Sequence, residues 1–157
     1  MDVDVIVCNH AETAENKLFV TGGGVNMAFV APQPPHVISL GLGAVIHVPY
    51  QATNQAHTFK VALMDEDGNA VVPFHAEGPE PSQIEFEAPF NVGRPPMIAV
   101  GDEQTISVAV NFKNLPLAQP GLYSFVVSIN GHEARRLPFR IMTPPPGVII
   151  PGLTPGT

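Results

Sequence analysis

Hydrophobic and polar residues alternate through most of the chain, which is the pattern of a strand with one buried and one exposed face. The longest run is residues 36–48, and its hydrophobic positions fall on one face: Ile38, Leu40, Leu42, Ala44, Ile46 and Val48. Shorter runs predict further strands at residues 3–7, 17–21, 27–31, 57–64, 70–74, 84–90, 106–112, 123–129 and 137–141. No segment has convincing helical spacing, so the sequence predicts an all-β protein.

Turn signals divide these runs into hairpins. Asn130-Gly131 separates the last two predicted strands, and these residue types supply the positive φ angles that a tight hairpin turn requires. The polar run at residues 65–69 predicts another hairpin. Pro138 has no N–H group, so we expect it on an edge strand or in a bulge.

Composition supports one folded domain. The chain has 157 residues, of which 45% are hydrophobic and 13% charged, so a charge-driven disordered protein is excluded. Its 18 prolines and 14 glycines are scattered among the apolar runs, which excludes long helices. From Pro144 onward the sequence has five prolines and no charged side chain. We therefore expect a β-sandwich domain at residues 1–142 and an extended proline-rich tail at residues 143–157.

The spacing Leu115-x-x-x-Gln119-x-Gly121-x-Tyr123-x-Phe125 resembles the tyrosine corner of immunoglobulin-type domains, with Gln in place of Asp and Phe in place of Cys. The resemblance implies an immunoglobulin-like antiparallel β-sandwich in which the Tyr123 hydroxyl binds upstream backbone. Tyr123, Gly121 and the turn residue Gly131 would then be structural. The chain has one Cys and no Trp, so the disulfide-and-tryptophan core of antibody domains does not apply.

As a whole, the chain resembles an uncharacterised family of small bacterial proteins that is common in actinobacteria. The segments that carry this resemblance are residues 17–24, 63–71, 92–96, 115–131 and 136–141. The family has no assigned activity. The resemblance therefore implies no catalytic residue.

Net charge and the absence of targeting signals limit the classes of partner and the cellular compartment that we expect. The net charge is −7, and the basic residues are dispersed apart from Arg135-Arg136, so we expect no nucleic-acid partner. We also expect no membrane partner, since no apolar run approaches the roughly 18 residues of a membrane span. The N-terminus lacks the positive region of a secretory signal, and Cys8 has no second cysteine to pair with. These features favour the cytoplasm, with Cys8 as a buried small hydrophobe.

No motif assembles an enzyme site, and we expect no metal and no cofactor. Six histidines are spread singly, and only His47 and His57 lie on neighbouring predicted strands where a cupin-type metal site could begin. Residues 65–69 match the first three ligand positions of an EF-hand loop, but Ala76 stands where its bidentate Glu should be. The glycines at 22–24 lack the Lys-Ser or Lys-Thr of a phosphate loop. The sequence favours a protein that is not an enzyme.

The leading hypothesis is a non-enzymatic interaction or structural β-sandwich that binds a protein partner or itself. The polar side of residues 36–48 is nearly bare and could meet another molecule at Ser39, Gly41 and Gly43. A second contact is expected where the tail could add a short strand to an exposed sheet edge, at Val148, Ile149 and Ile150.

Two alternatives stay open. One is a β-sandwich that binds a small molecule or carbohydrate through four polar side chains: His47, Tyr50, His57 and Arg94. The other is a cupin-type metal-dependent enzyme.

Overall fold

The computed structural model describes residues 1–152, and this part of the chain is all-β, as predicted. Its strands are β1 (Asp2–Ala14), β2 (Lys17–Gly23), β3 (Met27–Phe29), β4 (His36–Val48), β5 (His57–Asp65), β6 (Glu85–Phe90), β7 (Gln104–Leu117), β8 (Gly121–Ile129) and β9 (His132–Met142). A short 3-10 turn at Tyr50–Ala52 follows β4. Among the described residues there is no helix with the length and hydrophobicity needed to cross a membrane.

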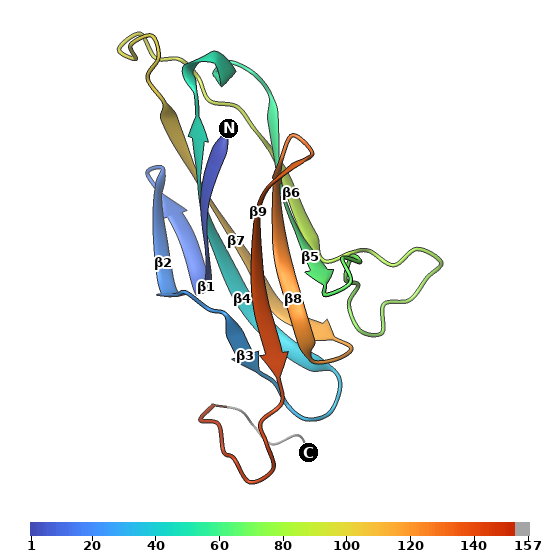
Figure 1. The fold of residues 1–157 in the computed structure, drawn as a ribbon. Helices are drawn as coiled ribbons and strands as arrows, with labels where there is room; N and C mark the ends of the chain where they lie inside the picture. Colours follow the sequence, from blue (N-terminus) through green and yellow to red (C-terminus); the bar gives the residue numbers. More distant parts are fainter. Residues whose placement is uncertain (153–157) are drawn as a thin grey trace.

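The strands form two sheets that lie against each other (Figure 1). The first sheet has the order β2-β1-β4-β7, and the second has the order β3-β9-β8-β5-β6. Neighbouring strands are antiparallel, except that β3 pairs parallel to β9. Their inward faces enclose one hydrophobic core.

Aromatic stacking marks the centre of this core. Phe125 of β8 is fully buried, with its ring 5.4 Å from that of Phe112 and 5.0 Å from that of Phe139. Phe112 comes from the first sheet and the other two from the second. The stack therefore joins the two layers through the large apolar area that phenylalanine buries.

The pattern over residues 36–48 predicted β4 correctly. All six of its predicted inward residues are buried. The prediction of a strand at residues 70–74 is wrong. In this segment Ala70 alone forms a bridge, to Met64, and the strand that pairs with β5 on this side is β6. Pro73 cannot donate the hydrogen bond that would continue the pairing, which ends this segment after Val71.

The hairpin and edge expectations in the last third are confirmed. Asn130 and Gly131 have φ angles of 52° and 80° and join β8 to β9. β3 pairs only with Arg140–Met142 of β9, so Pro138 lies on an open edge of the second sheet. The missing N–H of proline costs no strand-pairing hydrogen bond at this position, because that side of β9 faces an open edge.

Candidate interaction surface

The outer face of β4 is covered by the chain itself. A Cβ atom on Gly41 would lie 2.7 Å from Asn111 Oδ1 and 3.1 Å from the Ala11 backbone nitrogen. A Cβ atom on Gly43 would lie 3.0 Å from the side chain of Leu18. Both glycines are buried. The close approach that these glycines permit is thus intramolecular, which corrects the expected interface at Gly41 and Gly43.

The cover is the hairpin of β1 and β2, and two asparagines hold it in place. Asn111 of β7 accepts a hydrogen bond from the Ala11 N–H (3.0 Å) and donates one to the Ala11 carbonyl (2.8 Å). Asn16, at the hairpin tip, donates to the Thr105 carbonyl (2.8 Å) and accepts from the Ser107 N–H (2.9 Å). Each amide satisfies backbone groups of another strand, which fixes the hairpin on the sheet.

Ser39 is exposed and has a local role. Its hydroxyl oxygen accepts a hydrogen bond from the Asn114 N–H at 2.9 Å. The β4–β7 register shifts between Ile38 and Leu40, so the serine hydroxyl lies at an irregularity of the sheet. It satisfies a backbone donor of the neighbouring strand there.

The four residues expected to bind a small ligand separate into distinct groups. The Arg94 guanidinium lies 3.9 Å from the centre of the Tyr50 ring and donates to the Tyr50 carbonyl and the Thr53 hydroxyl. His57 is buried, and its two ring nitrogens contact the Ala52 carbonyl (2.7 Å) and the Asn130 amide (3.0 Å). These side chains hold the turn after β4. Within the part of the chain that the structure describes, they share no hydrogen-bond partner with His47.

His47 is held between two carboxylates at the N-terminal end of β1. Its Nε2 donates to Asp4 (2.8 Å) and its Nδ1 donates to Glu103 (2.7 Å). Both nitrogens donate only when the imidazole is protonated. The hydrogen bond to Asp4, followed by the one to Glu103, raises the pKa of His47 above its ordinary value of 6.5. Among the described residues, neither this group nor any other set of three His, Cys, Asp or Glu side chains is arranged so that it could hold a metal ion.

This clamp predicts a pH dependence of stability. Because the folded pKa of His47 is above the unfolded one, its contribution to folding is complete below about pH 6.5 and is lost as the pH rises through the folded value. We expect the His47 ring resonances to titrate above pH 6.5, and the midpoint to fall in Asp4→Asn. A midpoint at or below 6.5 in the parent protein would exclude the clamp.

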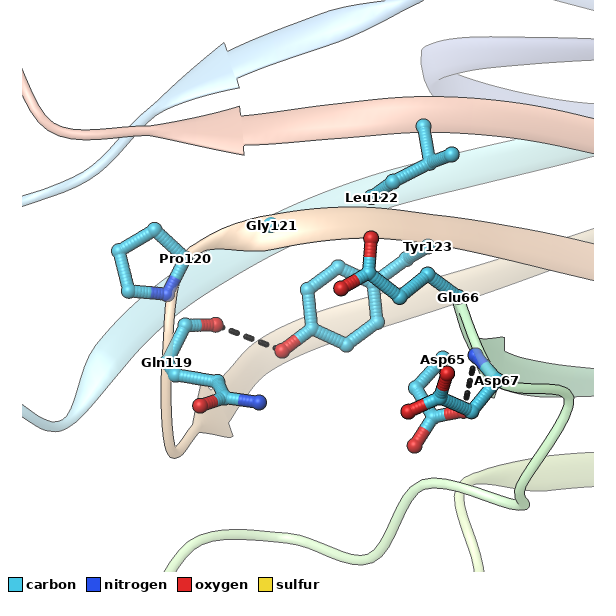
Figure 2. Close-up of a pocket in the computed structure, with 8 residues that line it drawn as sticks. All are labelled: Asp65, Glu66, Asp67, Gln119, Pro120, Gly121, Leu122 and Tyr123. Atoms are coloured by element: carbon cyan, nitrogen blue, oxygen red, sulfur yellow. Dashed lines mark hydrogen bonds between the residues drawn. The ribbon is translucent and has the colours of Figure 1, made fainter.

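Tyr123 makes the hydrogen bond expected from the residues before it. Its hydroxyl donates to the Gln119 carbonyl at 2.6 Å, as Figure 2 shows. Burial, and then the nearby Asp65 carboxylate, raises the pKa of Tyr123, so the hydroxyl stays protonated as a donor. The hollow beside it has a volume of about 40 Å³, enough for a few waters but not for a substrate. The hydroxyl thus ties the start of β8 to the backbone before it.

Across this hollow, the turn at residues 65–69 is held by its own side chain (Figure 2). Asp65 Oδ1 accepts hydrogen bonds from the backbone N–H groups of Asp67 (3.0 Å) and Asn69 (2.8 Å). This is the usual role of Asp at the start of a turn. The segment is a turn after β5 whose first carboxylate is used by its own backbone.

The tail leaves β9 at the end of the molecule opposite to the N-terminus (Figure 1). The strand expected at residues 148–150 is not formed within the described chain, where Val148 N–H instead closes a turn on the Pro145 carbonyl at 3.1 Å. Ile149 is 90% exposed. The tail therefore presents apolar side chains to solvent.

A shallow groove lies on the outer face of the second sheet and has a volume of about 350 Å³. Most of its lining residues come from β5, β6 and β8 and include Thr58, Lys60, Glu85, Glu87 and Ser128. Lys60 Nζ is 2.9 Å from Glu85 and 4.0 Å from Glu87. The sequence places Glu85 and Glu87 two apart on one exposed strand face. It does not indicate that Lys60 lies beside them, because alternation marks such positions only as solvent-facing.

Comparison with known proteins identifies the family without adding an activity. No curated protein matches the chain. No solved structure matches it either. Residues 4–142 match a family described as a family of unknown function, DUF6941. This match ends where β9 ends and covers both sheets, so the chain belongs to the DUF6941 family.

Proposed function

We propose that this protein is a non-enzymatic β-sandwich that associates with further copies of itself through its C-terminal tail. The observation that carries the proposal is the exposure of the apolar side chains of Val148 and Ile149, in the segment Val148–Ile150 of an uncharged tail. Exposing such side chains to water is unfavourable, and exposed apolar segments commonly mark contacts with other molecules. The domain ending at Met142 supplies the hydrophobic core without any of the tail residues up to 152.

The proposal includes an immunoglobulin-like arrangement of the strands. β1, β4 and β7 would correspond to strands A, B and E of one immunoglobulin sheet, and β9, β8, β5 and β6 to strands G, F, C and C′ of the other. Tyr123 lies near the start of β8, the position that a tyrosine corner takes on strand F. β2, which pairs with the outer edge of β1, is an addition to that plan. A single buried thiol, Cys8, suits the reducing cytoplasm of a bacterium.

Removing the tail tests this function. We expect a chain truncated after Met142 to lose self-association and keep the urea midpoint of the full chain, because none of the described tail residues belongs to the core. Size-exclusion chromatography with light scattering measures the mass of each form, and urea unfolding measures stability.

A matched pair of substitutions distinguishes the effect of a charge in the tail from the effect of a charge elsewhere on the surface. Ile149→Glu places a charge on the tail, and Val100→Glu places one on an apolar residue that is 84% exposed in a loop. We expect only Ile149→Glu to reduce the mass. An assembly that survives both the truncation and Ile149→Glu would show that the tail does not mediate it.

A small polar ligand is the second candidate, favoured by the groove around Lys60. Its ten lining residues include no aromatic side chain, so it lacks a surface on which a sugar ring could stack. A thermal-shift screen with the parent protein and Lys60→Met tests it. A ligand that stabilises the parent but not Lys60→Met would establish this site, and the absence of any such ligand counts against it.

A further inference from the structure

The structure has an open seam where the two sheets meet along β1 and β9. A groove of about 330 Å³ lies there, lined by apolar side chains that include Val5, Val25 and Leu137. All three pack against the hydrophobic core and are only partly buried. Covering the seam would remove this remaining apolar surface from water.

One wall of the seam is a strand edge with free pairing capacity. β1 pairs with β2 only from Cys8 onward, so its first half has β4 on one side and no described strand on the other. The Val7 carbonyl faces the open side, where it accepts hydrogen bonds from the N–H groups of Gly24 and Val25. Alternate residues of a strand direct their backbone groups to the same side, so the N–H and C=O of Val5 also face the seam.

At both ends of this free edge the backbone groups already have hydrogen-bond partners. At one end, Asp2 Oδ1 accepts hydrogen bonds from the Val3 N–H (2.8 Å) and from Arg135 (2.6 Å). At the other end, the Val7 carbonyl is already used. The open stretch is thus Asp4–Ile6, about 10 Å of strand. The opposite wall cannot pair there, because Pro138 of β9 has no N–H to donate.

We propose that the seam of one copy receives the segment Val148–Ile150 of a second copy as a short strand added to β1. This rests on the proposed self-association and names the surface that receives the tail. The segment is three residues long between Gly147 and Pro151, which matches the free stretch of β1. It is apolar and uncharged, so it would bring no unpaired charge into an apolar groove.

The position of β3 favours the tail of a second copy over the chain's own tail. β3 pairs with Arg140–Met142 and so lies on the seam side of the last residues of β9, between the start of the tail and the groove. Three prolines at 144–146 follow and favour an extended direction. In the described structure the Val148–Ile150 segment follows the turn that the Val148 N–H closes on the Pro145 carbonyl, and it adds to no strand.

A charge at the lip of the seam tests the proposal in the full-length chain. Ile6 lines the groove and is 37% exposed, whereas Val37 is an apolar residue of β4 that is 47% exposed and outside the groove. We expect Ile6→Glu to weaken self-association by at least about tenfold in light-scattering dilution series, and Val37→Glu to leave it unchanged. Equal association of Ile6→Glu and the parent would overturn the seam as the receiving site.

Disulfide trapping gives a readout that does not depend on the charged variant. In a Cys8→Ser background, one preparation carries Ile6→Cys and another carries Ile149→Cys. A mixed disulfide that forms only when the two are combined supports the proposal. A chain that carries both Ile6→Cys and Ile149→Cys is the control. If its two cysteines form a disulfide within one monomer, the proposal is overturned, because the tail then docks on its own chain. If truncation abolishes assembly but no mixed disulfide forms, the seam is not the surface that receives the tail, and the proposed self-association still holds. If the parent protein is monomeric, both the seam proposal and the proposed function are refuted.

Discussion

Gly41→Val is expected to lower the free energy of unfolding by about 2–3 kcal/mol. Valine normally favours strands, so propensity alone predicts the opposite sign. The cost arises because the first added carbon would lie 2.7 Å from Asn111 Oδ1, and that amide is fixed by two hydrogen bonds to Ala11. The hairpin of β1 and β2 must then lift from β7. Urea unfolding followed by circular dichroism measures the change.

Gly93→Val is the matched control. A Cβ atom on Gly93 would meet no atom within 4 Å, so the same substitution there should change stability little. Amide exchange at Ala11 should also accelerate in Gly41→Val, because its N–H loses the Asn111 acceptor. If Gly41→Val is as stable as the parent and Ala11 stays protected, the hairpin does not rest on β4 in the way described.

Tyr123→Phe should cost about 1–3 kcal/mol. The substitution keeps the buried ring but removes the donor to the Gln119 carbonyl, and an acceptor left without a partner in a part-buried position is destabilising. Tyr50→Phe is a control of the same chemistry, since the Tyr50 contacts described with Arg94 use its ring and carbonyl. A urea midpoint that Tyr123→Phe leaves unchanged would show that the hydrogen bond contributes nothing to the fold.

Local sequence signals predicted the strands well where a single face is buried. The alternation over β4 identified its inward residues, and Asn130-Gly131 identified the β8–β9 turn, because both depend on neighbouring residues only. The failure at residues 70–74 has a local cause too. Pro73 lies inside an apolar run, and its missing N–H outweighs the pattern.

The cover over Gly41 and Gly43 could not be predicted from the sequence in the same way. It depends on Asn111 meeting Ala11 across a separation of 100 residues, and a lone asparagine on a polar face gives no sign of its partner. Backbone comes close to Gly41 at the Ala11 nitrogen, whereas the atoms close to Gly43 belong to the side chains of Leu18 and Val20. The sequence does not indicate which segment makes either approach. The His47 clamp was missed for the same reason, since Asp4 and Glu103 are far apart in the chain.

Sedimentation equilibrium of the full-length chain over a range of concentrations tests self-association most directly. The monomer mass is 16.7 kDa. We predict a weight-average mass that rises with concentration toward a multiple of this value, and a constant 1–142 monomer mass for the chain truncated after Met142. A full-length chain that keeps the monomer mass at every concentration would contradict self-association.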